Sequence, residues 1–137
     1  MERKRVRIIE RIFRGYEENK KQLEKDYGLP VPSGVAYDRP SVKADNARNG
    51  TEESFIRYAA RRETLYKRVF IVEETLKWFR LEGHGRERFI RDFFIGGCSW
   101  VKTEMECCVS RDTLARWRRD VLEKAETIAS WIEFFDT

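Results

Sequence analysis

The stretch from residue 99 to residue 121 most strongly constrains the fold, because it predicts two helices joined by a tight turn: SWVKTEMECCVSRDTLARWRRDV. Ser110 is a suitable cap for the second helix, since its side chain can accept a hydrogen bond from a backbone N–H two or three residues later. After the cap, Leu114, Trp117 and Val121 recur at three- and four-residue spacing and predict one buried stripe. The other positions carry four arginines between residues 111 and 119. The pattern therefore predicts a helix-turn-helix whose second helix has one apolar side and one arginine-rich side.

The predicted turn departs from the general helix-turn-helix pattern at two positions. Where the two helices approach most closely the pattern prefers alanine, and this chain has Glu104. Where the turn prefers glycine, because a positive φ costs glycine nothing, this chain has Cys108. We expect Glu104 to rotate outward or to pair with an arginine, and Cys108 to be mildly strained or to lie in a turn of another geometry. An ordinary helical hairpin with solvated charged faces is the alternative interpretation of this stretch.

An arginine-rich helix face is suited to the major groove of DNA, because the planar guanidinium can contact a guanine edge or a phosphate at two points. The front of the second helix is predicted to meet base edges, and nearby polar and basic residues are predicted to meet phosphates. Trp117 is assigned to the core. The expected base-contacting residues are Arg111, Asp112, Thr113 and Arg116, and the expected phosphate-contacting residues are Ser110, Lys102, Arg118 and Arg119.

The run from residue 98 to residue 125 resembles the RinA and ArpU group of phage transcriptional regulators. A tryptophan opens its first helix, and its second helix reads Ser-Arg-x-Thr-x-x-x-Trp-Arg. This motif-level similarity covers the C-terminal third of the chain, whereas the rest matches in length, order of helices and charge character. The resemblance implies a domain similar to region 4 of sigma factors, binding to double-stranded DNA at promoters, and activation of late phage or prophage genes with host RNA polymerase. It also implies a location in the cytoplasm of a bacterial host.

Two other interpretations of the motif stay open. A packaging or replication protein, such as a small terminase subunit, also uses a helix-turn-helix but assembles into rings. A helical adaptor without a DNA role is the third possibility. An affinity that does not change with salt concentration would favour the adaptor, because binding through phosphates weakens steeply as the salt concentration rises.

Charge is unevenly distributed along the 137 residues, whose net charge is +4. Residues 1–25 hold nine basic and five acidic residues, whereas residues 123–137 hold one lysine and four acidic residues. Basic segments attract phosphate and acidic segments avoid it, so the acidic C-terminal segment is expected to face a protein partner or solvent. Hydrophobic residues make up 41% of the chain, which is sufficient for a compact core despite 38% charged residues.

Hydrophobic periodicity predicts an all-α fold, in which an N-terminal helix and a long central helix join a C-terminal helix-turn-helix bundle. Residues 1–28 are predicted as a basic N-terminal helix, spanning 3–27, whose narrow apolar stripe can pack on the central helix or pair with a second copy of itself. Residues 29–50 contain all three prolines and are predicted as a linker. Residues 51–137 are predicted to hold the long helix and the DNA-binding domain.

The long helix is predicted to begin at a Thr51 cap and to end near residue 81. At roughly 45 Å it is longer than a compact domain needs, which predicts either a break near Thr64 or contact with a second copy. A short helix is expected over residues 86–95, and the apolar side of the last helix is expected to continue almost to the chain end. The expected inward residues of these two segments are Phe89, Ile90, Phe93, Leu122, Ala125, Ile128, Ala129, Trp131 and Ile132.

The residues that most often carry chemistry form no catalytic or metal pattern in this sequence. Adjacent cysteines rarely bind one zinc ion and no Cys-x-x-Cys is present, so Cys107 is predicted in the core, and Cys98 and Cys108 beside the turn. Nothing in the sequence supplies an oxyanion site for a cysteine assisted by His84, so we expect neither enzymatic activity nor a cofactor. No apolar run approaches the roughly 20 residues of a membrane span, and three cysteines suit a reducing compartment.

Overall fold

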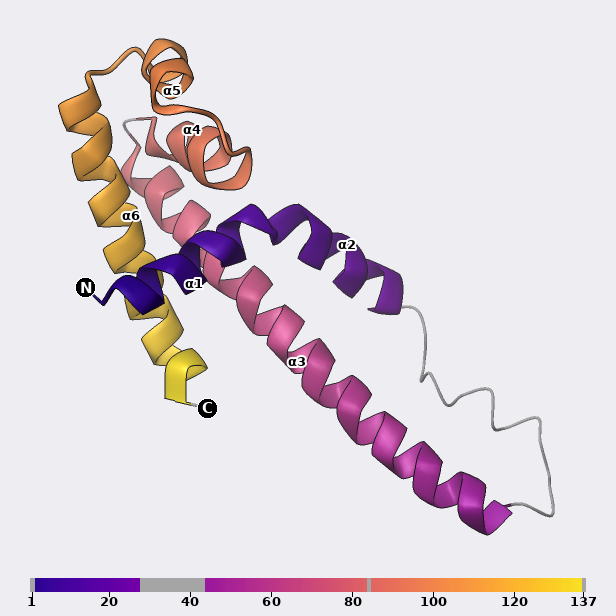
Figure 1. The fold of residues 1–137 in the computed structure, drawn as a ribbon. Coiled ribbons are helices and arrows are strands. Elements are labelled where there is room, and N and C mark those ends of the chain that lie inside the picture. Colours follow the sequence, from indigo (N-terminus) through magenta and orange to yellow (C-terminus); the bar gives the residue numbers. More distant parts are fainter. Residues whose placement is uncertain (1, 28–43, 84, 137) are drawn as a thin grey trace.

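The computed structural model describes residues 2–27, 44–83 and 85–136, and these residues form helices and no strand (Figure 1). The predicted all-α class is therefore confirmed for the described part of the chain. The described residues comprise six α-helices, one π-helical turn that continues the fourth helix, and one short 3₁₀ turn after the last helix. In chain order these are α1 (Arg3–Arg14), α2 (Tyr16–Tyr27), α3 (Ala44–Glu82), α4 (Arg86–Phe89), the π-helical η2 (Ile90–Ile95), α5 (Trp100–Cys107), α6 (Arg111–Trp131) and the 3₁₀ turn η3 (Phe134–Asp136).

The long helix α3 is the spine of the molecule (Figure 1). Helix α6 lies against the C-terminal half of α3, α1 crosses both, and α2 lies along α3. Helices α4 and α5 and the turn η2 cover the end at which α3 finishes. One core joins these elements, and its fully buried side chains include Ile9, Phe13, Val72, Phe89, Leu114 and Ile128.

The N-terminal helix predicted over residues 3–27 is divided at Gly15. Helix α1 ends at Arg14, Gly15 has φ −90° and ψ 7°, and α2 begins at Tyr16. Glycine weakens a helix by about 0.5–1 kcal/mol relative to alanine, so a change of direction costs least at this position. The bend lets α1 pack on α6 and η2 while α2 packs on α3.

The long helix begins earlier than predicted and is unbroken. It spans Ala44–Glu82, 39 residues, or about 58 Å at a rise of 1.5 Å per residue. Residues 44–50, predicted as part of the linker, belong to this helix, and Thr51 lies within it rather than at its cap. The remainder of the predicted linker, up to residue 43, lies outside the described residues. Thr64 does not break the helix, and its hydroxyl donates to the Ala60 carbonyl oxygen at 3.0 Å.

The two halves of α3 differ in burial. Toward its C-terminus, Leu65, Val69 and Leu76 recur at helical spacing and are buried. Toward its N-terminus, Phe55 and Ile56 are 51% and 65% exposed, because this half extends beyond the other described helices (Figure 1). The apolar spacing of α3 therefore continues past the part of the helix that the rest of the molecule covers.

The segment predicted as one short helix over residues 86–95 changes helix type within its length. Helix α4 passes into η2, in which the Gly96 N–H donates to the Arg91 carbonyl oxygen, five residues back, at 2.8 Å. This wider turn rotates the following side chains, so that Phe94 is buried and Phe93 is only half-buried. Phe89 and Ile90 are buried as predicted.

Candidate nucleic-acid interface

Serine side chains begin both helices of the predicted motif. Ser99 precedes α5 and accepts a hydrogen bond from the Lys102 N–H at 3.2 Å. Ser110 precedes α6 and accepts from the Thr113 N–H at 3.3 Å, which confirms the predicted cap. Each serine satisfies one of the N–H groups that a helix start leaves without a partner inside the helix. These local contacts fix the starts of both helices, and the Ser110 contact thereby fixes the end of the turn.

The turn between α5 and α6 consists of residues 108–110. Cys108 adopts the left-handed conformation, with φ 57° and ψ 40°. The structure thus shows the first of the two expectations for Cys108, mild strain, because a residue with a Cβ occupies a position of positive φ. Val109 is half-buried and packs on the core, which holds the turn against the rest of the molecule.

One side of α6 is buried and the other is exposed. The predicted stripe of Leu114, Trp117 and Val121 lies in the core, so this part of the prediction is confirmed. Trp117 packs edge-on against Phe89, with ring centroids 5.9 Å apart. Trp131, predicted to continue the apolar side, is instead 65% exposed, because it lies on the last turn of α6. The Lys124 Nζ lies over its ring, 5.0 Å from the centroid. Leu122, Ala125, Ile128 and Ala129 are buried as predicted, and Ile132 is half-buried.

The four predicted base-contacting residues lie together on the first turns of α6. Arg111, Asp112 and Arg116 are exposed, and Thr113 is half-buried with its hydroxyl 3.0 Å from the Ser110 Oγ. Among the described residues, Arg116 makes no ion pair, whereas the Arg111 Nε donates to the Glu104 Oε1 at 2.6 Å. Of the two expectations for Glu104, the structure therefore shows the pairing with an arginine.

The predicted phosphate-contacting residues divide into two groups. Ser110, Lys102 and Arg119 are exposed near the turn and along α6. Arg118 is instead half-buried, and its Nη2 donates to the Glu10 Oε1 at 2.6 Å, which joins α6 to α1. This partner, 108 residues away in sequence, has no local signal and was missed by sequence reasoning.

Arg86 is a further residue that sequence reasoning missed. Its guanidinium lies over the rings of Phe79 and Trp117, at 5.6 and 5.8 Å from their centroids, and it pairs with Asp120 at 3.4 Å. Arg86 thereby holds the N-terminus of α4 to both α3 and α6. Its contact with the Trp117 ring also helps to hold the buried side of α6 in place. The neighbouring His84 lies outside the described residues.

Cys108 lies in the turn as predicted, whereas Cys98 precedes the Ser99 cap at the other end of α5. Cys107 is half-buried against the core, and burial raises the pKa of its thiol above the usual value, which keeps the sulfur protonated at neutral pH. Cys98 is half-buried and Cys108 is exposed. Within the described residues, no three histidine, cysteine or acidic side chains come together as metal ligands.

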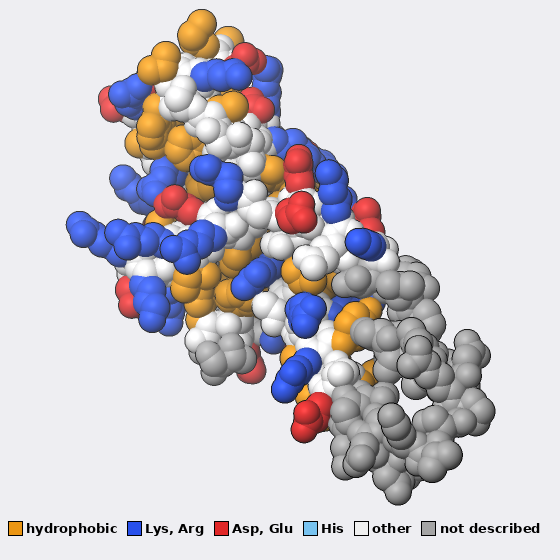
Figure 2. Space-filling view, turned by 45° about the vertical axis from the view of Figure 1, so that its right-hand side comes forward, with side chains coloured by type: hydrophobic (Ala, Val, Ile, Leu, Met, Phe, Trp, Pro, Cys, Tyr) orange, Lys and Arg blue, Asp and Glu red, His pale blue; other side chains and the backbone are white. Residues whose placement is uncertain are grey.

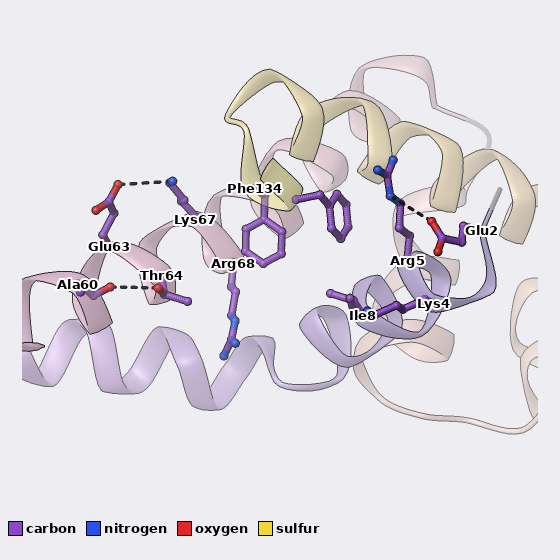
Figure 3. A pocket seen from close by; sticks show the side chains of 11 residues that line it. Glu2, Lys4, Arg5, Ile8, Ala60, Glu63, Thr64, Lys67, Arg68 and Phe134 are labelled. Carbon is purple, nitrogen blue, oxygen red and sulfur yellow. Dashed lines mark hydrogen bonds and ion pairs between the residues drawn. The ribbon is translucent and has the colours of Figure 1, made fainter. Parts of the chain in front are cut away.

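A groove of about 610 Å³ lies on another part of the molecule, between α1, α3 and η3 (Figure 3). Its acidic side chains are paired with bases near them in sequence: Glu63 with Lys67 at 3.4 Å, and Glu2 with Arg5 at 3.7 Å. The Phe134 ring lies between these two pairs in the close view. This mixture of exposed ion pairs and aromatic surface is typical of a solvated groove between helices.

Comparison of this chain with family models, curated proteins and solved structures finds no match. Within the described residues, none of the helices combines the length and apolar character needed to cross a bilayer.

Proposed function

We propose that this protein binds double-stranded DNA with sequence preference through α5, the turn and α6, acting as a helix-turn-helix domain similar to region 4 of sigma factors. The observation that carries the proposal is the division of α6 into two sides. Leu114 and Val121 are fully buried, so the helix is firmly held, and Arg111, Arg116 and Arg119 project from its exposed side. A rigid helix with an arginine-rich exposed side fits the major groove in size and chemistry.

In this proposal the residues of the interface have two kinds of role. Arg111, Asp112, Thr113 and Arg116 contact base edges, because they lie at the front of α6. Lys102, Ser110, Arg118 and Arg119 contact phosphates and set the position of α6 in the groove. The Arg118 side chain has the least freedom of these, since Glu10 already holds it toward α1.

The resemblance to the RinA and ArpU regulators supports the wider role, in which the protein regulates late phage or prophage genes at promoters together with host RNA polymerase. The acidic C-terminal segment is the surface we assign to a protein partner, because acidic residues are unsuited to DNA.

We further propose that the N-terminal half of α3 pairs with a second copy of the chain. Phe55 and Ile56 on this half of the helix, and Tyr66 just past its midpoint, are each more than half exposed. At roughly 100 Å² of exposed area each, these three side chains of two copies supply about 600 Å² of the roughly 1,200–2,000 Å² that a stable interface buries. The exposed and small Ala59 and Ala60 permit close approach of the two helices.

The DNA-binding proposal is tested by capturing genomic fragments from the phage or its host and then measuring binding to the enriched fragment and to a mixed-sequence duplex. Arg116→Ala is expected to cost about 1–3 kcal/mol on the enriched site and little on the mixed sequence. Arg61→Ala, on the exposed N-terminal half of α3, is the control and is expected to bind both duplexes as the parent does. If Arg116→Ala also binds both as the parent does, the base-reading role of Arg116 is wrong.

The mass of the protein in solution tests the pairing. A dimer that Ile56→Glu converts to a monomer supports pairing through α3, and a parent that is monomeric at high concentration contradicts it. A ring of many copies would favour the packaging protein over the promoter regulator.

A further inference from the structure

The exposed side of α1 carries a row of arginines. Arg3, Arg7, Arg11 and Arg14 follow one another at spacings of four, four and three residues, which places them on one face of the helix. All four are exposed. The row spans about 17 Å along the helix axis, a length over which one strand of DNA presents about five phosphates.

The acidic residues near this row are already paired with other bases. Glu10 pairs with Arg118 of α6, and Glu2, next to α1, lies 3.7 Å from Arg5. Arg5 itself pairs with Glu126 and lies over the Phe135 ring, so it belongs to the buried side of α1. The positive charge of the exposed row is therefore not neutralised within α1.

Helix α1, which carries the row, packs on α6. Val6, one residue before Arg7, shares a hollow of about 440 Å³ with Ala115 and Arg119 of α6 and with Trp100 of α5. Figure 2 shows basic side chains projecting along the left-hand edge at the height where α1 crosses α6 in Figure 1.

The other end of the row reaches the segment that leads into α5. The Arg14 Nε donates to the Phe94 carbonyl oxygen at 3.4 Å, and its Cζ lies 3.1 Å from the place where a Cβ on Gly97 would stand. Gly97, with φ 69°, is two residues before the Ser99 cap of α5. The row is thus carried by a helix that packs on α6, and its Arg14 end reaches the segment before α5.

We infer that the arginine row of α1 is a second phosphate-binding surface, which follows the DNA backbone beside the groove that α6 enters. This inference rests on the proposed function, because it assigns the row to the same duplex. Guanidinium groups bind phosphate at two points and need no base contact, so the row adds affinity and orientation without adding sequence preference. The row lies on a helix that packs on α6, the helix proposed to enter the groove, and this favours DNA over an acidic protein as the partner.

The test removes three charges from the row and compares their effect with the same loss elsewhere. The variant is Arg3→Gln, Arg7→Gln and Arg11→Gln; Arg14 is kept because of its contact with the Phe94 carbonyl. The control is Arg57→Gln, Arg61→Gln and Arg68→Gln, three exposed positions on α3. Binding to a mixed-sequence duplex of thirty or so base pairs is measured across a range of salt concentrations, and circular dichroism checks that each variant is folded.

The row variant is expected to lower the slope of log affinity against log salt by about 2 to 3, since each lost phosphate contact contributes about 0.9. The variant Arg3→Lys, Arg7→Lys and Arg11→Lys is expected to keep most of the slope, and the α3 control to change it little. The preference for the enriched site should be the same in all four proteins.

The possible failures separate the two proposals. If the parent binds DNA and Arg116→Ala loses preference, but the row variant has the slope of the parent, the row has another partner and the inference is wrong while the proposed function stands. If the α3 control lowers the slope as much as the row variant, net charge explains the effect and the inference is again wrong. If the parent shows no salt-dependent binding, the proposed function fails and the inference with it.

Discussion

Replacing Cys108 with glycine should stabilise the protein. Cys108 has φ 57° in the turn between α5 and α6, and the left-handed conformation costs a residue with a Cβ about 1–2 kcal/mol. Glycine avoids this cost but loses about 0.4–1 kcal/mol through its greater freedom in the unfolded chain. The side chain is exposed, and its contact is a weak one, from the Sγ to the Met105 carbonyl oxygen at 3.6 Å. The expected gain is therefore about 1 kcal/mol, or an increase of roughly 2–4 °C in Tm.

Cys108→Ala is the matched control, because alanine removes the same thiol but keeps the Cβ and the positive φ. Thermal unfolding of the parent and both variants, followed by circular dichroism under reducing conditions, measures the difference. The expected order of Tm is glycine above parent, with alanine close to the parent. A glycine variant no more stable than the alanine variant would show that the strain at Cys108 does not exceed the roughly 0.4–1 kcal/mol that glycine loses through the unfolded chain, and the expected gain would then be wrong.

Three further predictions concern the core, the link between α1 and α6, and the cysteines. Trp117→Ala should lose about 3–5 kcal/mol of stability, because it removes a buried ring, and chemical unfolding would contradict this if the loss were below about 1 kcal/mol. Glu10→Gln and Arg118→Gln should show a coupling of roughly 0.5–1 kcal/mol in a double-mutant cycle, since both side chains are more than a third exposed and water screens the pair. Iodoacetamide at pH 8 should modify Cys108 well before Cys107, because burial raises the pKa of the Cys107 thiol and lowers its thiolate fraction; mass mapping showing equal rates would contradict this.

The parts of the fold that depend on local contacts were predictable from the sequence. The Ser110 cap depends only on the N–H three residues later, and the burial of Leu114 and Val121 follows from their spacing on one helix. The bend at Gly15 was missed because the apolar spacing continues from Phe13 to Tyr16, so the sequence shows no change of phase there.

The parts that depend on tertiary packing were not predictable in the same way. Hydrophobic periodicity gives the same signal for burial at Phe55 and at Leu65. Only Leu65 is buried, because α1, α2 and α6 reach only part of α3. The π-helical turn moves Phe94 inward in place of Phe93, since its five-residue hydrogen bond departs from the spacing that a helical pattern assumes. The Glu10 partner of Arg118 comes from another helix, and no spacing within α6 indicates it.

The ion pair between Arg111 and Glu104 bears on how the proposed interface would meet DNA. The pair is short, 2.6 Å, but the arginine side chain is 58% exposed, so its contribution to stability is below about 1 kcal/mol. A bidentate contact between arginine and a guanine edge contributes about 1–3 kcal/mol of discrimination, which exceeds the cost of breaking the pair. Glu104 therefore does not prevent Arg111 from reaching a base. The Glu104 carboxylate instead holds the Arg111 guanidinium near the turn in the free protein, and in the proposed complex a guanine edge takes its place. Glu104→Ala should then leave the affinity for the enriched site unchanged or raise it, and a loss of more than tenfold would show that the carboxylate positions Arg111 in the complex itself.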